Sequence, residues 1–402
     1  MRSFDVPEFY RSPIIGRVKA ARKAADPRKQ DLSPTVLDFG PVRFVLARHF
    51  GFCFGVEHAI EVAYAAIAEQ QGRNIFLLSE MIHNPEVNED LRSRGVRFLM
   101  DTDGTRRIPF ETLTAEDVVV VPAFGTTLEI SAELEARGVD LKAYDTTCPF
   151  VEKVWKRSAV LSNEAHTVVI HGKPGHEETR ATFSHAAGNG HAVIVKDLAE
   201  ARWLADFLTD PDALGGDAAF SARFAGRTTP GFSWHTHFDR IGVVNQTTML
   251  ATETAAIADL LRNAVLARGG TAANTRDTLC YATNDNQQAT LAALDAGADV
   301  AVVVGGYNSS NTTHLVELCT ERMPTYFIRN ELEFTEEGLR HFDVHAEEVR
   351  VAHNPWPRPA SEATILLTSG ASCPDASVDR VLQRILAAYP GARTVEEVLA
   401  EV

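Results

Sequence analysis

The chain has 402 residues and is too long to fold around one typical hydrophobic core. This length predicts two or three domains. Hydrophobic residues make up 45% of it and charged residues 23%, as in globular proteins. Its formal net charge of −15 excludes a protein that binds nucleic acid through a general basic surface. No apolar run approaches the roughly 20 residues of a membrane span, and the first residues, MRSFDVPEFYRS, lack the apolar core of a signal peptide. We therefore expect a cytoplasmic protein.

Short apolar runs alternate with longer segments of helical pattern from residue 44 onward. The runs expected to form strands are FVLARHF, NIFLLSE, VVVVPAF, HTVVIHG, HAVIVKD, RIGVVNQ, VAVVVGG, PTYFIRN and TILLTSG. This alternation predicts an α/β protein with mainly parallel sheets. In such units the functional loops follow the carboxyl ends of the strands.

The expected divisions of the chain follow from this pattern and from composition. A polar segment with a basic stretch, GRVKAARKAADPRKQ, reads as an N-terminal extension. A stretch rich in Gly, Pro and polar residues, 207–237, predicts a surface insertion in the second domain. The predicted boundaries are 1–43 for the extension, 44–147, 148–279 and 280–376 for three similar α/β domains, and 377–402 for a C-terminal helical segment.

Three of the five cysteines occupy equivalent positions. Cys53, Cys148 and Cys280 each follow a predicted strand and open a predicted helix, in HFGFCFGVEHAI, DTTCPFVEKVW and DTLCYATNDNQQA. This repeat predicts three similar units, each offering one thiol. A helix N-terminus favours the thiolate, so three converging thiols could hold an iron-sulfur cluster and leave one iron open. Cys319, inside an amphipathic helical pattern, and Cys373, in a different context, are expected to be dispensable for a cluster.

The motif HGKPGHEET carries His176 and Glu178 at a predicted strand-to-helix junction. A histidine can bind a phosphate oxygen and a carboxylic acid can deliver a proton. An acidic first turn that complements the helix dipole explains the motif equally well. His83, in SEMIHNPEVNEDL, is on its own best explained as a capping or packing residue.

Three further loops combine hydroxyl groups, amides and glycines with a predicted helix N-terminus. Such loops are suited to holding phosphate without bulk cationic charge, although ordinary N-capping explains each one separately. Their polar residues are Gln246, Thr247 and Thr248, then Ser309, Ser310 and Asn311, and finally Ser372.

Taken together, these motifs resemble a known family, the 4-hydroxy-3-methylbut-2-enyl diphosphate reductases (LytB/IspH). The resemblance runs in order from about residue 44 to 376 and favours the plant and cyanobacterial branch. In the other bacterial branch a histidine stands where this chain has Phe124, so no role is assigned to Phe124. The motifs that carry the resemblance are GFCFGVEHAI, IHNPEVNEDL, DTTCPFVEKVW, HGKPGHEETRAT, NQTTML, DTLCYATNDNQ, GGYNSSNTTHL and TSGASCPD.

The resemblance implies three α/β domains around one 4Fe-4S cluster per chain. Cys53, Cys148 and Cys280 would be its ligands, and its open fourth iron would meet the substrate. Glu178 would donate protons, and Thr247 would position the substrate hydroxyl and the proton path. The residues implied to bind the substrate are His83, His176, Thr247, Ser309, Ser310, Asn311 and Ser372.

The activity implied by the resemblance is the last step of the methylerythritol phosphate route to isoprenoids. (E)-4-hydroxy-3-methylbut-2-enyl diphosphate would lose its allylic hydroxyl and give isopentenyl and dimethylallyl diphosphate. The electrons would come from an external one-electron donor, a ferredoxin or flavodoxin, and the protein would be a monomer or homodimer without nucleic-acid or membrane partners. An acidic chain needs a local basic patch to dock such a donor, and the sequence does not locate it.

Two alternatives remain open from the residues alone. One is a mononuclear zinc hydrolase of a phosphorylated metabolite, built from His83, His171, His176 and Glu178, which leaves the cysteine repeat unexplained. The other is a non-catalytic redox sensor with a labile cluster, which leaves the hydroxyl loops unexplained.

Overall fold

The computed structural model describes residues 7–273, 278–353, 355–356 and 363–402. The chain divides into two compact units. The first unit comprises residues 1–57, 83–89 and 281–402, and the second comprises 58–82 and 90–280. Each unit contains a sheet with mainly parallel strands.

The first unit contains a five-stranded sheet in the order β1-β2-β15-β10-β11. The β1–β2 pair is antiparallel and the other pairs are parallel. Val304 pairs with Ser369 and Leu46 with Leu367, so β2, β15 and β10 end at the same edge of the sheet. The strands are β1 (Thr35–Asp38), β2 (Val42–Leu46), β10 (Val300–Val304), β11 (Thr325–Ile328) and β15 (Ala363–Ser369).

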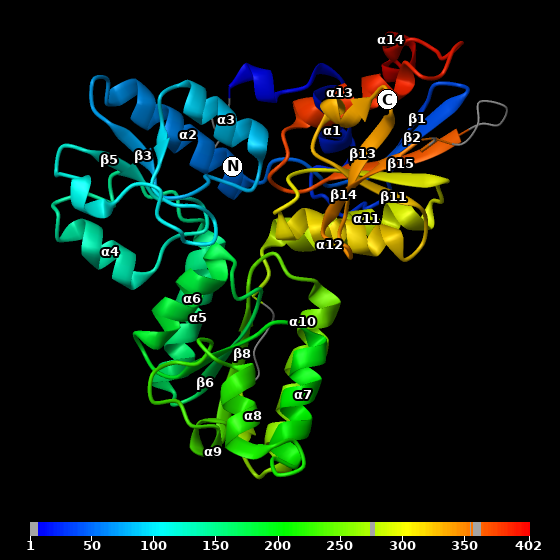
Figure 1. The fold of residues 1–402 in the computed structure, drawn as a ribbon. Helices are drawn as coiled ribbons and strands as arrows, with labels where there is room; N and C mark the ends of the chain where they lie inside the picture. Colours follow the sequence, from blue (N-terminus) through cyan, green and yellow to red (C-terminus); the bar gives the residue numbers. More distant parts are fainter. Residues whose placement is uncertain (1–6, 274–277, 354, 357–362) are drawn as a thin grey trace. The chain divides into compact units, whose positions relative to one another are not determined.

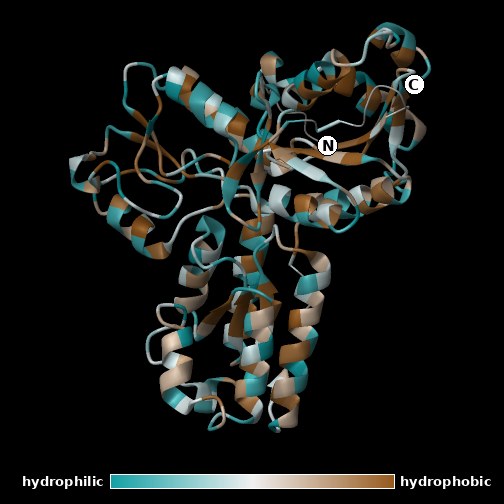
Figure 2. Ribbon diagram, turned by 45° about the vertical axis from the view of Figure 1, so that its right-hand side comes forward, coloured by the Kyte–Doolittle hydropathy of each residue, from teal (hydrophilic) through white to brown (hydrophobic). Residues whose placement is uncertain are grey.

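Helices cover both faces of this sheet, with α11 and α12 on one side and α1 and α13 on the other (Figure 1). Every residue of β10 is buried, as expected for a parallel strand that is covered on both faces. In Figure 2 the parallel strands are mostly hydrophobic, whereas the helices carry both hydrophobic and hydrophilic residues. The helices are α1 (Pro13–Ala25), α11 (Tyr281–Asp295), α12 (Ser310–Thr320), α13 (Asp375–Leu386) and α14 (Val395–Leu399). An antiparallel meander, β12 (Phe334–Thr335), β13 (Gly338–Asp343) and β14 (Glu348–Ala352), packs beside β11.

The described part of the N-terminal segment is folded, although its sequence shows little periodicity. Helix α1 begins because Ser12 caps it and Pro13 occupies its first turn; the Ser12 hydroxyl accepts a hydrogen bond from the Ile15 amide at 2.8 Å. Ile14, Ile15 and Val18 are buried in the core. The segment therefore adds a helix and a strand to the first unit.

The second unit contains two parallel sheets, β4-β3-β5 and β7-β6-β8-β9. In the four-stranded sheet His171 pairs with Asn245, so the carboxyl ends of β6 and β8 are adjacent. Helices α5 and α6 pack together against it, as do α7 and α10 (Figure 1). The strands are β3 (Ile75–Leu77), β4 (Arg97–Phe98), β5 (Val118–Val120), β6 (Thr167–His171), β7 (Ala192–Val195), β8 (Arg240–Asn245) and β9 (Thr271–Ala272). The helices are α4 (Leu128–Glu135), α5 (Pro149–Asn163), α6 (Glu177–Ala187), α7 (Leu198–Thr209) and α10 (Ala251–Ala267), while α2 (Phe54–Glu69) and α3 (Pro85–Ser93) each include residues of both units.

The segment 207–237 is more than the surface excursion that its composition predicts. It contains α8 (Gly216–Arg223) and α9 (Trp234–His237). Phe220 and Phe224 are buried in the same hydrophobic cluster as residues of α7. The ring centroids of Phe220 and Phe207 are 5.6 Å apart. The aromatic side chains therefore tie this segment to the second unit.

None of the helices in the described ranges is both long and apolar enough to cross a membrane. The three-domain boundaries predicted from the sequence stay a prediction.

Candidate functional site

A buried carboxylate and a threonine meet where β6 and β8 end. His176 caps α6, and its Nδ1 accepts a hydrogen bond from the Glu178 amide at 3.1 Å. The Glu178 side chain, on a residue that is 1% exposed, reaches the loop after β8. Its Oε1 accepts a hydrogen bond from the Thr247 amide at 2.5 Å, and its Oε2 accepts one from the Thr247 hydroxyl at 2.9 Å. Glu178 and Thr247, both predicted as site residues, are thus in direct contact.

Gln246 holds the two loops in register. Its side-chain oxygen accepts hydrogen bonds from the Lys173 amide at 3.2 Å and from the Thr179 hydroxyl at 3.0 Å. The contact is so close that a Cβ on Gly172 would lie 2.6 Å from the Thr179 hydroxyl and 3.0 Å from the Gln246 Cβ. The glycine of the HGK motif is therefore required by the close approach of Thr179 on α6 and of Gln246 in the loop after β8.

Cys280 is positioned by the same strand end. Its amide donates a hydrogen bond to the Thr247 carbonyl at 3.2 Å. Just before it, the Asn245 side-chain oxygen accepts hydrogen bonds from the Thr278 amide and hydroxyl, both at 2.8 Å. Thr278 and Cys280 are thus both held by the loop after β8, next to the residue that contacts Glu178.

Cys148 occupies the N-cap position of α5, and its amide donates a hydrogen bond to the Ala123 carbonyl at 3.0 Å. The pKa of its thiol is raised to about 11, mainly by burial and also by the nearby Cys280 and Glu178, while the backbone amides of Phe150 and Val151 act in the opposite direction. These three groups therefore share one electrostatic environment. Two half-buried thiols and a buried carboxylate that lie this close repel one another when ionised. A bound metal cluster would supply the positive charge that this donor set needs, so Cys148 and Cys280 fit such a group.

The hydroxyl loops of the first unit meet at the carboxyl ends of β10 and β15. Ser309 caps α12, and its hydroxyl accepts hydrogen bonds from the Thr312 amide at 3.3 Å and the Thr312 hydroxyl at 2.9 Å. The Ser372 hydroxyl lies 3.5 Å from the Ser309 hydroxyl. The Asn311 side-chain oxygen accepts a hydrogen bond from the Ala371 amide at 2.9 Å. We call Ser309, Ser310, Asn311 and Ser372 the hydroxyl cluster.

His83 lies against this hydroxyl cluster and is buried. Its carbonyl accepts a hydrogen bond from the Ser372 hydroxyl at 3.3 Å. A Cβ on Gly306 would lie 2.4 Å from the same carbonyl oxygen, so only glycine fits there without a shift of the backbone. The structure therefore brings His83 together with the hydroxyl loops, as the resemblance implies. Ser310 is also buried, with its hydroxyl 3.5 Å from the His314 Nε2.

Cys53 follows β2 and directly precedes α2, and it belongs to the first unit. Its amide donates a hydrogen bond to the Ala371 carbonyl at 3.2 Å, which ties it to the loop that carries Ser372. Cys148 and Cys280 belong to the second unit. Among the described residues, no group of three or more Cys, His, Asp or Glu side chains is arranged to hold a metal ion. A single cluster bound by all three thiols is therefore a proposal.

The other two cysteines are core residues. Cys319 and Cys373 are both fully buried among the hydrophobic residues of the first unit. Burial raises the pKa of the Cys319 thiol to about 12 and also raises that of Cys373. Both thiols are therefore enclosed by apolar side chains, where a cysteine behaves as a small hydrophobic residue.

Sequence reasoning missed residues that position the site. Asn245 anchors Thr278, and the Phe124 ring packs edge-on against His176 with centroids 5.4 Å apart. A polar residue that ends a buried apolar strand, as Asn245 does, was the available signal. His171, part of the zinc alternative, is fully buried, and its Nδ1 lies 3.0 Å from the Thr254 hydroxyl on α10.

Comparison with known proteins gives a consistent result. The family model described as "LytB protein" matches residues 44–386. A 4-hydroxy-3-methylbut-2-enyl diphosphate reductase of Gloeobacter violaceus is 38% identical over 391 residues, which cover 95% of this chain and 88% of that protein. The reductase of the same name from Thermosynechococcus vestitus is 40% identical over 356 residues, which cover 87% of this chain and 85% of that protein.

Solved structures match the fold as well. The E-1-hydroxy-2-methyl-but-2-enyl-4-diphosphate reductase of Plasmodium falciparum superposes with a TM-score of 0.61 at 21% identity, over 86% of this chain and 88% of that one. The α/β fold class and the family resemblance predicted from the sequence are thereby confirmed. The chain belongs to the LytB protein family, whose members are iron-sulfur enzymes.

Proposed function

We propose that this chain reduces (E)-4-hydroxy-3-methylbut-2-enyl diphosphate to isopentenyl and dimethylallyl diphosphate, the last step of the methylerythritol phosphate pathway. Each turnover consumes two electrons and two protons, breaks the allylic carbon–oxygen bond and releases one water. Family membership and the name shared by the curated relatives support this activity. The observation that carries it is the buried Glu178 carboxylate, held by Thr247 beside the thiols of Cys148 and Cys280.

The cofactor we propose is one 4Fe-4S cluster, bound by Cys53, Cys148 and Cys280. When bound, it would supply electrons and a Lewis acid for the substrate hydroxyl. Each of the three cysteines lies at or just before a helix N-terminus, where the helix dipole favours a thiolate.

Glu178 is the proposed proton donor, and Thr247 the proposed relay. A threonine hydroxyl can accept a proton from a carboxylic acid while donating its own to a third group. The 2.9 Å contact between Thr247 and Glu178 provides the first half of such a path. Since Glu178 is only 1% exposed, bulk water has little access to the acid, and the proton can be delivered to the departing hydroxyl.

The hydroxyl cluster, with His83 and His176, is the proposed diphosphate site. Ser309 and Ser310 lie at the start of α12, where the helix dipole favours an anion. A chain with a formal net charge of −15 has no general basic surface to bind an anion, so local groups must bind it. Uncharged hydrogen-bond donors can bind phosphate oxygens in this way. Binding the diphosphate away from the reacting carbon would orient the substrate.

An external one-electron donor must supply the electrons, and we propose a ferredoxin or flavodoxin. The cytoplasmic location and a monomeric or homodimeric state remain part of this proposal.

An anaerobic turnover assay tests the proposed function. The purified protein should oxidise a chemically reduced viologen dye only when substrate is present, and both products should form. Glu178→Gln should keep the visible absorption of the cluster and lose roughly 10²- to 10⁴-fold in turnover, since that is what a general acid contributes. Glu177→Gln is the matched control, because the Glu177 side chain bonds Ser79 instead of Thr247, and it should stay within about threefold of wild type. Wild-type turnover by Glu178→Gln would refute the proton-donor role.

A further inference from the structure

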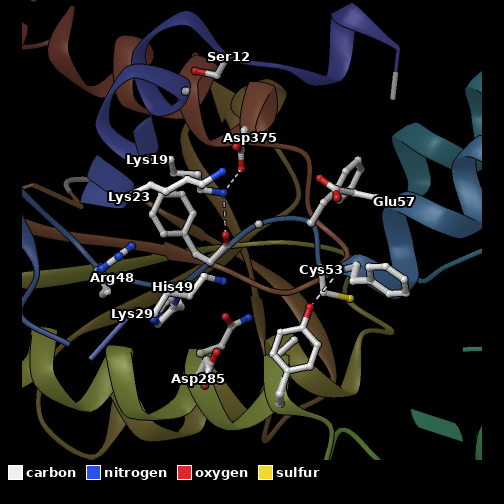
Figure 3. A pocket seen from close by; sticks show the side chains of 18 of the residues that line it. Ser12, Lys19, Lys23, Lys29, Arg48, His49, Cys53, Glu57, Asp285 and Asp375 are labelled. Carbon is white, nitrogen blue, oxygen red and sulfur yellow. Dashed lines mark hydrogen bonds and ion pairs between the residues drawn. The ribbon is translucent and has the colours of Figure 1, made fainter. Parts of the chain in front are cut away.

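A cavity of about 610 Å³ opens in the first unit beside Cys53 (Figure 3). In that view the basic side chains of its wall lie on one side and Cys53 on the other. The charged groups of the wall are three carboxylates and five cations; the cations are Arg11, Lys19, Lys23, Lys29 and Arg48. The cavity is therefore locally positive in a chain whose formal net charge is −15.

Most of this basic wall comes from the N-terminal segment, which lies outside the residues matched by the family model. Lys19 and Lys23 are four residues apart on α1, so they share one face of the helix. The packing of Ile14, Ile15 and Val18 into the core fixes which way that face points. The segment thus supplies most of the basic surface of the cavity.

Some of these cations are neutralised within the wall and others are not. The Lys19 Nζ lies 2.6 Å from an Asp375 carboxylate oxygen, and Arg48 lies 3.7 Å from Asp26. Lys23 and Lys29 are exposed and form no ion pair within the described part of the chain. Their charge is available to a partner.

Lys29 is held in an uncommon backbone conformation, with a φ of 55° in the left-handed region. The Asp26 carboxylate fixes the turn by accepting hydrogen bonds from the Gln30 amide at 3.1 Å and the Asp31 amide at 3.0 Å. The Lys29 amide donates to the Asp26 carbonyl at 3.2 Å. The turn that carries Lys29 is therefore fixed by the Asp26 side chain.

We propose that this cavity and the lysines at its rim are the docking site of a small acidic one-electron carrier protein. The inference rests on the proposed function, because Cys53, which lines the cavity, would then be a ligand of the cluster that the carrier reduces. Each docked carrier would be oxidised by one electron. Two successive carriers would supply the two electrons that, with two protons, remove the hydroxyl as water.

The charge of the chain and the mixed lining of the cavity favour a protein over a small anion. An acidic carrier is repelled by a chain of charge −15, so a local positive surface is needed to steer it into one orientation. The wall also contains Tyr281, which is 40% exposed, as well as three carboxylates. An aromatic group and mixed charges suit a protein surface better than a free diphosphate, which would meet the carboxylates directly.

The test compares a protein donor with a dye in the double variant Lys23→Glu and Lys29→Glu. With an enzymatically reduced plant-type ferredoxin at low salt, the KM for ferredoxin should rise at least about tenfold. Turnover with the reduced viologen dye should stay within about twofold, because a dye needs no docking site. The matched control, Lys142→Glu with Lys196→Glu, makes the same charge change at two exposed lysines of the second unit and should leave the ferredoxin KM unchanged. Replacing Lys23 and Lys29 with arginine should preserve it.

Three results would overturn the proposal. They are an unchanged ferredoxin KM in the Lys23 and Lys29 variant, an equal rise in the control, and an equal loss of turnover with the dye. Binding of inorganic pyrophosphate that needs both lysines, with unchanged ferredoxin kinetics, would assign the cavity to a small anion. Absence of dye turnover in the wild-type protein would instead contradict the proposed function, so the two failures can be told apart.

Discussion

The hydrogen bond between the Thr247 hydroxyl and Glu178 predicts that the two residues act as a unit. Thr247→Val keeps the shape of the side chain and removes the 2.9 Å hydrogen bond to Oε2. A hydrogen bond to a charged group contributes about 1.5–3 kcal/mol. If it acts on the chemical step, its loss lowers turnover by roughly 10- to 150-fold, since 1.36 kcal/mol is tenfold in rate. Thr247→Ser keeps the hydroxyl and should stay close to wild type.

The double variant Thr247→Val with Glu178→Gln distinguishes a unit from two independent residues. If Thr247 relays the proton of Glu178, the double variant should lose no more turnover than Glu178→Gln alone. Once the acid is removed, Thr247 has no proton to pass on, so its own replacement has no further effect. The assay is dye-driven anaerobic turnover, with the visible absorption of the cluster as a control for its content. A loss in the double variant equal to the product of the two single losses would refute the relay.

Three further predictions concern other parts of the site. Changing any one of the three proposed cluster cysteines to serine should lower the iron content of the purified protein, whereas Cys319→Ser, in the core, should not. Gly306→Ala places a Cβ 2.4 Å from the His83 carbonyl oxygen. Overpacking of this kind costs about 1–3 kcal/mol of stability, and the shift of the backbone should raise the KM for the diphosphate substrate. Gly16→Ala is the control, because a Cβ there meets nothing within 4 Å. In cluster-free protein the Cys148 pKa of about 11, against an ordinary 9.0, leaves roughly a hundredth of the usual thiolate, so mass spectrometry should find it alkylated far more slowly at neutral pH than in the unfolded chain.

Local patterns predicted the strands and the loops at their ends, because buried parallel strands and helix caps each depend on a few consecutive residues. They could not predict which strands pair. Strand β2 pairs with β15, more than 300 residues away in the chain, and this pairing brings the Cys53 amide to the Ala371 carbonyl.

The contact between Glu178 and Thr247 shows the same limit. Both residues were predicted from their motifs and from the resemblance, but the hydrogen bonds depend on the adjacency of β6 and β8. Helix α1 was missed although Ser12 and Pro13 are a standard helix start, because its apolar face consists of few residues. The basic patch that the sequence could not locate depends on how that helix packs.

The iron environment tests the central claim most directly. Mössbauer spectroscopy of anaerobically purified, iron-57-labelled protein should show one 4Fe-4S cluster per chain, and addition of substrate should change the signal of one iron and leave the other three unchanged. That result is predicted if Cys53, Cys148 and Cys280 bind three irons and the fourth meets the substrate. A protein that contains zinc in place of iron, or a cluster whose four irons are all unaffected by substrate, would contradict the account.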